Sequence, residues 1–379
     1  MGRRWRFRAW VCVLALVGAN GAEAALYENE KLELFADFRA RLEIDWNSMN
    51  PEGVERDDRV RLRTRVRFGV RYDPDDHFSI AARLRSGSDD SQQSPHITLI
   101  DFNGIDTGDS DFNLDRWYAR FAGGGFWSWL GRNDFPFWKQ NELFWDDDVT
   151  VLGAALGGTW SRDKRSLAMT GGCFRLPVGM QAFSGNLVAA QVAHGTQGER
   201  LSTTVAAGAY RIDPSEDDPD AAKLLTGNGY RDYTIVELSG QLRRAVGGRP
   251  LAVGLDLLRN LEDYDSDDAD PFTAANHDQT DGFVVSAVYG SLAEKNSWLV
   301  GYWYAWIEAF AVHASYAEDD WERWGTANQA RSSNFKGHEL RYARAVSAKA
   351  NVVARLFLIE SITTVEDGNR FRVDLDIRF

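Results

Sequence analysis

Two consecutive segments near the start of the chain alternate between apolar and charged residues. From Leu32 to Trp46 every even position is apolar, and every odd position except Phe35 is charged. Residues 59–72 repeat the pattern, with six arginines at alternate positions. A period of two is that of a β-strand, whose side chains point alternately to opposite faces. Ordinary strands have about five or six residues, so any fold for this chain must accommodate unusually long strands with one apolar and one charged face.

Two architectures can hold such strands. In a soluble β-sandwich the apolar face would form the core, and the row of arginines would dominate the solvent face of a two-sheet domain. In a transmembrane β-barrel the apolar face meets lipid and the charged face lines a wet lumen, with about 9 to 11 residues of each strand crossing the bilayer. The length of the strands and the density of arginine favour the barrel.

Similar patterns continue to the end of the chain and predict sixteen strands, an even number as in single-chain bacterial barrels. The predicted strands are 31–46, 58–73, 77–87, 114–122, 126–132, 149–162, 165–175, 185–195, 200–212, 231–245, 250–262, 281–291, 297–311, 336–347, 349–361 and 369–379. Long connections are expected at 88–113, 133–148, 213–230, 263–280 and 312–335. We therefore predict an all-β, antiparallel up-and-down transmembrane barrel of about 16 strands, with short periplasmic turns and long outer loops.

The first 24 residues have the composition of a secretory signal peptide. Four arginines precede an apolar core from Val11 to Gly18, and Ala22-Glu23-Ala24 matches a small-x-small cleavage signal. The apolar core is too short for a membrane anchor. We expect residues 1–24 to be removed and residues 25–379 to form a single barrel domain. Only Cys173 then remains, so no intrachain disulfide can form.

The C-terminal strand points to an outer-membrane address. Apolar residues at alternate positions from Phe371 to Phe379 are separated by charged residues, and the chain ends on Phe379. A terminal Phe on an alternating strand resembles the assembly signal of Gram-negative outer-membrane barrels. We expect the outer membrane of a Gram-negative bacterium as the location, with its lipid, its lipopolysaccharide and the barrel-assembly machinery as partners. Aromatic residues near strand ends suit interfacial girdles: Trp46, Tyr72, Trp117, Trp127, Trp298 and Tyr302.

An ordered set of motifs lies between residues 114 and 153. In chain order they are Leu114-Asp115-Arg116-Trp117-Tyr118, Gly131-Arg132-Asn133-Asp134-Phe135-Pro136-Phe137, Trp145-Asp146-Asp147-Asp148, Val149-Thr150-Val151 and Gly153. Together with the arginine-rich block 59–85 and the C-terminal strand, this order resembles the putative-porin family of Gram-negative outer-membrane proteins. The resemblance implies a pore and identifies no substrate. A weaker likeness is to alginate-type polysaccharide-export barrels, which also carry an arginine-rich lumen and a Gly-Arg motif.

The arginines of the charged faces are candidate pore-lining residues. They could form a positive strip that attracts anions and focuses the field in the pore. They could instead pair with Glu33, Asp37, Glu43 and Asp45 on the neighbouring strand and brace the wall. Both roles can hold at once. The candidate strip comprises Arg59, Arg61, Arg63, Arg65, Arg67, Arg71, Arg83, Arg85, Arg116, Arg120 and Arg132.

Residues 133–148 form a candidate constriction loop. A loop exposed to water would carry few bulky aromatic side chains, so we expect this one to fold into the lumen. Packing on the barrel rim or against a partner subunit is the alternative. If the loop folds inward, the acidic residues at its end should approach the wall that carries Arg61 to Arg67. The candidate residues are Asp134, Phe137, Trp138, Glu142, Trp145, Asp146, Asp147 and Asp148.

Composition excludes several other functions. The chain has 43 Lys and Arg against 56 Asp and Glu, whereas nucleic-acid binding relies on basic residues that neutralise phosphates. The six histidines show no metal-site spacing. Acidic runs at Glu216–Asp218 and Asp265–Asp270 could hold Ca²⁺. The second run lacks the glycine and terminal glutamate of an EF-hand loop, so solvated acidic loops and no cofactor are expected.

These patterns predict a porin, a water-filled channel for passive diffusion of small polar or anionic solutes, with a homotrimer as the candidate assembly. A polysaccharide-export channel is one alternative. A second is an outer-membrane hydrolase with catalytic residues at the barrel rim, such as His96, Asp101, His277 and Asp278. Because no G-x-S-x-G motif accompanies them, we expect no enzymatic activity.

Overall fold

The computed structural model describes residues 25–104, 111–215, 231–321 and 332–379, and the predicted signal peptide lies outside them. Within these residues it contains one helix, α1 (Pro271–Asn276), and one sheet of β-strands. The strands are β1 (Ala25–Glu28), β2 (Leu32–Met49), β3 (Glu55–Arg56), β4 (Arg59–Tyr72), β5 (Phe78–Ser86), β6 (Ile97–Asp101), β7 (Phe112–Gly123), β8 (Phe126–Asp134), β9 (Thr150–Arg162), β10 (Arg165–Pro177), β11 (Phe183–Gln197), β12 (Leu201–Asp213), β13 (Tyr233–Val246), β14 (Arg249–Asn260), β15 (Asp281–Gly290), β16 (Trp298–Ile307), β17 (Phe335–Ala345), β18 (Ala350–Ser361) and β19 (Asp367–Arg378). No helix among the described residues is long and apolar enough to cross a membrane.

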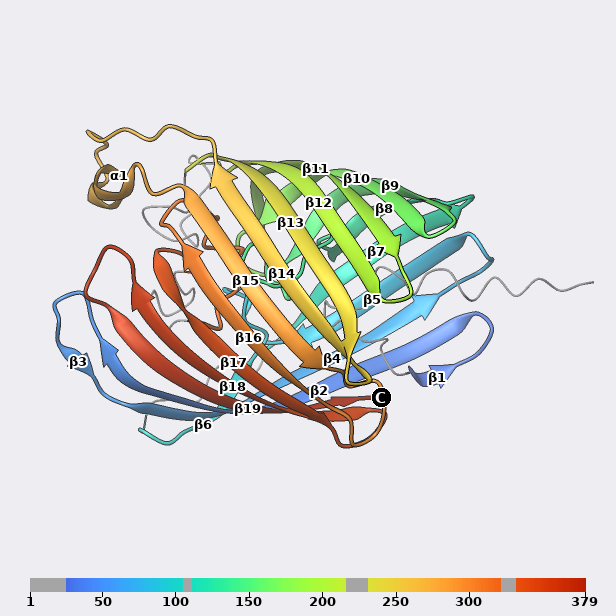
Figure 1. Cartoon of the computed structure of the whole chain (residues 1–379), viewed down its shortest axis with the longest axis horizontal. Coiled ribbons are helices and arrows are strands. Elements are labelled where there is room, and N and C mark those ends of the chain that lie inside the picture. The colour runs from blue at the N-terminus through green and yellow to red at the C-terminus, as the bar shows by residue number, and fades with distance from the viewer. Residues whose placement is uncertain (1–24, 105–110, 216–230, 322–331) are drawn as a thin grey trace, which may run out of the picture.

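Sixteen of the strands close into an antiparallel barrel, which confirms the predicted fold class (Figure 1). Each barrel strand pairs with the next along the chain, and β19 pairs with β2, so that Phe371 lies opposite Ile44. β1, β3 and β6 are short additional strands that pair with β2 or β4. Closure leaves no open edge, which satisfies the backbone polar groups as the bilayer core requires.

Short and long connections lie at opposite ends of the barrel. The short turns gather at the end where the C-terminus lies, whereas β3, β6 and α1 lie at the other end (Figure 1). β13 and β14 are joined by Gly247 and Gly248, with φ of +57° and +77°. Two successive residues with positive φ give a turn whose twist matches that of the flanking strands, and glycine adopts this conformation without steric cost. A two-residue glycine turn therefore keeps this end short.

The outer surface of the barrel is apolar. Leu130 of β8, Leu156 of β9, Leu238 of β13 and Val285 of β15 are exposed, as expected for side chains that face lipid. Trp127 is an exception to the predicted girdle, because it packs against the buried hydrophobic cluster inside the barrel. A Cβ atom added at Gly157 would lie 2.5 Å from Cζ2 of Trp127. The girdle prediction for Trp127 was therefore wrong.

The lumen is divided into an apolar and a charged half. On the side of β9 to β18 the inward side chains form a buried hydrophobic cluster, to which two outer connections also contribute. Tyr210, Ile212 and Ile235 belong to the barrel wall in this cluster, and Trp145 and Phe310 belong to the connections. On the side of β19, β2, β4 and β5 the inward side chains are mostly arginines and carboxylates. The lumen therefore combines a dry core with a charged wall.

The terminal Phe379 has a defined place in the barrel. Its backbone N–H donates to the carbonyl of Ala36 at 2.9 Å, and its ring is 40% exposed on the outer surface. We expect Phe379→Ser to lower the amount of heat-modifiable barrel in outer membranes several-fold, because an assembly signal needs the terminal aromatic ring. Phe121→Ser removes an exposed ring from β7 and should leave the amount unchanged. Equal amounts of barrel in the parent and Phe379→Ser would contradict a role for Phe379 in assembly.

Candidate pore constriction

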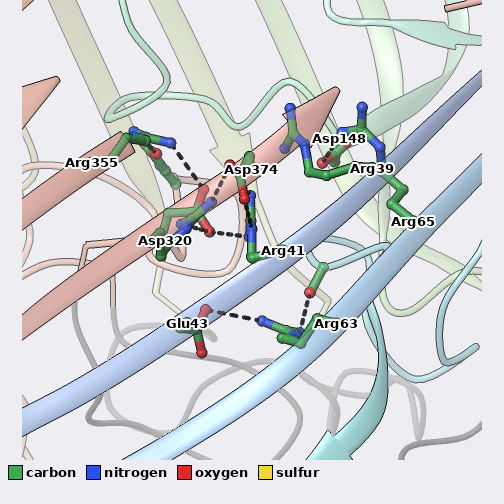
Figure 2. A network of polar contacts seen from close by, with 12 residues as sticks. Arg39, Arg41, Glu43, Arg63, Arg65, Asp148, Asp320, Arg355 and Asp374 are labelled. Atoms are coloured by element: carbon green, nitrogen blue, oxygen red, sulfur yellow. Dashed lines mark hydrogen bonds and ion pairs between the residues drawn. The ribbon is translucent and has the colours of Figure 1, made fainter. Parts of the chain in front are cut away.

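The inward faces of β19, β2 and β4 form a wall of alternating charges. The register places Arg39 opposite Arg65 and Arg41 opposite Arg63 on β2 and β4. Like charges directly opposite each other are destabilising. The neighbouring strand on the other edge of β2 compensates the charges of the β2 arginines. There, Asp376 and Asp374 of β19 accept hydrogen bonds from Arg39 at 2.5 Å and from Arg41 at 2.8 Å, respectively. We call these three inward faces the arginine wall (Figure 2).

The carboxylates of β2 also pair with arginines of β4. Asp45 accepts from Arg59 at 2.8 Å, and Glu43 accepts from Arg61. Asp37 lies between two arginines, 2.8 Å from Arg65 and 2.6 Å from Arg67. A fourth carboxylate, Glu33, pairs with Arg71 at 2.6 Å. Each of the four carboxylates named from the sequence therefore contacts an arginine and braces the wall.

The connection between β8 and β9 crosses the lumen. On the side of the lumen opposite the arginine wall, the side chains of Gln140 and Asn141 each donate to Asp256 of β14 at 2.6 Å. Trp138 is fixed to Gln191 of β11 by two hydrogen bonds of 2.8 Å between its backbone and the amide side chain. Residues 135–149, here the first lumen loop, therefore span from the wall of β11 to β14 across to the arginine wall.

Only one of the three acidic residues at the end of this loop reaches the arginine wall. Asp148 pairs with Arg67 at 2.9 Å and with Arg65 at 3.7 Å. Asp147 instead pairs with Lys139 at 2.6 Å. Asp146 is 4% exposed and accepts from the backbone N–H of Asp148 at 2.6 Å. The expectation that all three approach the wall was wrong for Asp146 and Asp147, because adjacent loop residues point in different directions.

A second connection also enters the lumen, where the sequence patterns predicted the end of a strand at 308–311 and an outer connection from 312 onward. Residues 308–321, here the second lumen loop, follow β16 and are almost entirely buried. Asp320 of this loop contacts Arg41 at 3.2 Å, Arg355 at 3.3 Å and Arg372 at 2.5 Å (Figure 2). The signal in the sequence is the run 309–317, which has no Asp, Glu, Lys or Arg. Such a run suits burial better than an outer loop.

The two lumen loops contact each other directly. The rings of Trp145 and Tyr316 stack with centroids 5.2 Å apart. The N–H of Asp146 donates to the carbonyl of Tyr316 at 2.8 Å, and the N–H of Glu318 donates to the carbonyl of Glu142 at 3.0 Å. The loops therefore form one unit that is attached to the arginine wall through Asp148 and Asp320.

Carboxyl groups gather where the loops meet, and their pKa values are shifted in opposite directions. Burial raises the pKa of Glu142 to about 8, with the charges of Asp147 and Glu318 acting in the same direction. Burial also raises the pKa of Asp146, with Glu142 adding to the effect. Burial alone would raise the pKa of Asp148 as well, but the neighbouring Arg65 and Arg67 outweigh it and lower that pKa. At neutral pH the junction therefore holds a mostly protonated Glu142 beside an ionised Asp148.

A cavity of about 1990 Å³ extends from the short turns up to the lumen loops. Its lining includes Gly124 and Lys164 at the turn end and Asp148 and Asp319 at the loop end. Twelve basic and twelve acidic side chains line it. Those of β9 to β11 are mostly neutral, such as Thr170, whereas those of β17 to β19, β2, β4, β5 and β7 are mostly charged. The cavity therefore separates a charged wall from a neutral one.

The predicted arginines fall into three groups relative to this cavity. Five line it, namely Arg65, Arg67, Arg83, Arg116 and Arg120. Arg59, Arg61, Arg63 and Arg71 lie on β4 beyond its lining. Arg85 and Arg132 are buried. Arg85 donates to the backbone carbonyl of Ser91 at 2.7 Å, and Arg132 donates to that of Met180 at 2.6 Å.

The predicted loop residues divide similarly. Asp134 belongs to the end of β8. It lines the cavity together with Phe137, Trp138, Glu142, Asp146, Asp147 and Asp148. Trp145 is 1% exposed and belongs to the hydrophobic cluster. The sequence therefore located most of the cavity lining on this loop, although not the part that packs in the core.

The acidic outer loops show no metal site within the described part of the chain. In the run Asp265–Asp270, Asp268 pairs with Arg231 at 2.9 Å, and Asp270 caps α1 by accepting from the N–H of Thr273 at 3.0 Å. The run Glu216–Asp218 lies outside the described residues. Two of the candidate Ca²⁺ ligands therefore have partners within the protein.

The contact between the lumen loops should weaken as pH rises. A carboxyl released from the contact titrates near its ordinary value of about 4.3, whereas the pKa of Glu142 in the contact is about 8. Between these values the contact retains a proton that the released loop loses, so the contact loses stability as pH rises through this window. We expect near-ultraviolet circular dichroism from the Trp145–Tyr316 stack to fall as pH rises toward about 8 and to level off above that pH.

Glu142→Gln tests this origin, because glutamine cannot ionise. The variant should keep its near-ultraviolet signal at pH 9, while the far-ultraviolet signal of the barrel stays constant in both proteins. The same loss of signal in the parent and in Glu142→Gln would show that another group controls the contact.

A family model described as putative porin matches residues 20–211, about half of the chain. No curated protein matches the sequence. Among solved structures, the high pH structure of OprB from Pseudomonas putida is 13% identical, with a TM-score of 0.58 over 92% of this chain and 94% of that chain. OmpF from Salmonella typhi, in complex with daunomycin, is 11% identical, with a TM-score of 0.53 over 93% of this chain and 99% of that chain.

A third similar structure is OmpT from Vibrio cholerae in its trimer form, at 11% identity and a TM-score of 0.51 over 92% of this chain and 99% of that chain. At such identities the likeness shows a shared fold, and the family match adds the type of protein. The shared fold and the matched family are typical of a channel rather than of an enzyme. The chain belongs to the putative-porin family and is an outer-membrane β-barrel porin.

Proposed function

We propose that this porin passes small anionic and dipolar solutes along the arginine wall. The observation that carries the proposal is the cavity with arginines on one side and mostly neutral side chains on the other. A one-sided row of guanidinium groups creates a field across the path, and low-dielectric walls strengthen it. A solute with a carboxylate, a phosphate or a large dipole would orient in this field, whereas a simple cation would be repelled.

The protonation of the lumen loops supports a preference for anions. Basic and acidic side chains are equal in number along the cavity. At neutral pH Glu142 is mostly protonated, because its pKa is raised to about 8 by burial and by neighbouring carboxylates. Burial also raises the pKa of Asp146, with Glu142 adding to the effect. The ionised groups along the path then leave an excess of positive charge, which favours anions over cations of the same size.

The lumen loops would set the size limit of the channel. Together they fill the apolar half of the lumen and leave the charged half to the solute. Burying a large apolar side chain contributes about 1.5 to 3 kcal/mol, so the aromatic residues of both loops would hold them in place. Passive diffusion past a fixed constriction then needs no cofactor.

The assembly and the membrane context form part of the proposal. We expect residues 1–24 to act as a signal peptide and residues 25–379 to form a single barrel domain. A homotrimer in the outer membrane, assembled by the barrel-assembly machinery and surrounded by lipid and lipopolysaccharide, agrees with the trimer form of the similarly folded OmpT. Chemical crosslinking in native membranes would test the trimer.

Ion selectivity tests the arginine wall. Arg65→Gln leaves Asp37 paired with Arg67 at 2.6 Å, so the wall should keep its shape while the cavity loses one positive charge. We expect the chloride-to-potassium permeability ratio, measured from reversal potentials across a salt gradient, to fall by about twofold. Arg259→Gln removes an exposed arginine of the outer rim and should leave the ratio unchanged. Cation selectivity in the parent that Arg65→Gln does not alter would refute the proposal.

Unitary conductance tests the first lumen loop. Removing residues 137–144 takes away Gln140 and Asn141, which anchor the loop to Asp256. Conductance should rise about twofold or more, because the path widens while the ladder hydrogen bonds of the barrel stay closed. A deletion of residues 265–268 from an outer connection serves as the control. A folded deletion of 137–144 with the parent's conductance would place the loop outside the conducting path.

A further inference from the structure

The short-turn end of the barrel carries an excess of exposed basic residues along β9 to β18. Six arginines in this region form what we call the basic belt, namely Arg162, Arg165, Arg200, Arg244, Arg249 and Arg344. The five turns that join these strands contain three acidic residues, Asp163, Glu199 and Glu294. At the opposite end, residues 261–280 alone contain seven acidic residues and no Lys or Arg. The barrel is therefore electrically asymmetric along its axis.

Three arginines of the belt, Arg162, Arg244 and Arg344, face away from the lumen. Arg162 lies on the same face of β9 as the exposed Trp160, and Arg344 on the same face of β17 as the exposed Tyr342. Arg244 shares the outer face of β13 with the exposed Leu242. Arg162, Arg244 and Arg344 therefore lie outside the conducting path, whereas Arg165 also reaches the cavity at its turn end.

The belt is short of counter-charge within the protein. The register places Arg162 directly opposite Arg165 on β9 and β10, an arrangement that is unfavourable without a neighbouring anion. In the described part of the chain, the side chains of Arg162, Arg165 and Arg244 have no hydrogen bond or ion pair. By contrast, Arg211 and Arg259 at the outer end each contact carboxylates, with Arg259 2.7 Å from Asp281.

Aromatic side chains place the belt at the level of the lipid headgroups. The guanidinium of Arg249 lies over the ring of Trp298, 4.5 Å from its centroid. Trp160 packs edge-on against Phe126 beside Arg162, with ring centroids 5.5 Å apart. Tryptophan near strand ends marks the boundary between hydrocarbon and headgroups in membrane barrels. The unpaired guanidinium groups therefore lie where lipid phosphates lie.

We propose that the basic belt binds the phosphate headgroups of anionic phospholipids in the periplasmic leaflet of the outer membrane. A guanidinium matches a phosphate with two parallel hydrogen bonds, and this geometry suits Arg better than Lys. The opposed pair Arg162 and Arg165 forms the centre of the surface, since one phosphate between them would relieve their repulsion. The function goes beyond solute passage and uses a different face of the barrel.

Lipid competition measured by tryptophan fluorescence tests the proposal on the full mature chain. Phosphatidylcholine vesicles containing brominated phosphatidylglycerol or brominated phosphatidylcholine quench lipid-facing tryptophans in proportion to lipid binding, and Trp160 and Trp298 lie beside the belt. We expect a phosphatidylglycerol-to-phosphatidylcholine binding ratio of about five or more at low salt, since one basic residue near a membrane surface contributes about this factor. The ratio should approach one in Arg162→Gln/Arg244→Gln/Arg344→Gln, whose three arginines lie outside the cavity lining, and should fall with added salt in the parent.

Matched controls separate the possible outcomes. The triple variant Arg211→Gln/Arg259→Gln/Lys336→Gln removes three basic residues from the outer end and should keep the parent's ratio, and neither variant should change unitary conductance. A parent ratio near one, or a preference that survives loss of the belt, would overturn the proposal. Binding of the parent, but not of the belt variant, to purified peptidoglycan without any lipid preference would assign the belt to that polymer and reject the lipid. If the belt variant does not fold, a phosphatidylglycerol preference of the parent that salt does not reduce would reject the proposal.

Discussion

Charge compensation inside the barrel is the constraint on which the rest of the structure depends. A guanidinium removed from water needs an anion, because leaving it unpaired is costly. The strands β19 and β2 supply most of the carboxylates, yet the register still sets Arg39 against Arg65 and Arg41 against Arg63. Asp148 and Asp320 complete the compensation, and both belong to connections that enter the lumen. The path of these connections thus follows from the composition of the wall.

Apolar packing and ion pairs make different contributions to the position of the lumen loops. A partly solvated ion pair contributes about 0.2 to 1 kcal/mol, whereas a fully buried large apolar side chain contributes about 1.5 to 3 kcal/mol. Trp145, Phe310 and Tyr316 therefore supply most of the stabilisation, in a cluster that resembles the core of a soluble domain. The carboxylates of Asp148 and Asp320 orient the loops toward the arginine wall. This division explains how a barrel with so many internal charges also contains a dry interior.

The sequence located the strands well, because a period of two with charged and apolar faces admits few other folds. It could not orient β8, since Phe126 and Trp127 begin a stretch in which both faces carry aromatic rings. The sequence also did not reveal that residues 308–321 enter the lumen, although the uncharged run 309–317 was visible. Whether a loop enters the lumen depends on partners far along the chain. Asp320, for example, accepts a hydrogen bond from Arg41, which lies 279 positions away in the sequence. Likewise, a run such as Asp146 to Asp148 does not reveal which of its carboxylates points to the wall.

The arginine wall straddles the seam at which the first and last barrel strands meet. Arg41 and Asp374 are separated by 333 residues in the chain, and their hydrogen bond crosses this seam. Contacts between such distant residues form late, because the entropy cost of closing the intervening chain must be met first. The carboxylates that Asp374 and Asp376 contribute to the wall therefore arrive only when the ring of strands closes. Asp320, which contacts Arg41 of β2 and Arg372 of β19, acquires its full set of partners at that moment, so the channel takes its final cross-section as the last event of folding rather than during the growth of the sheet.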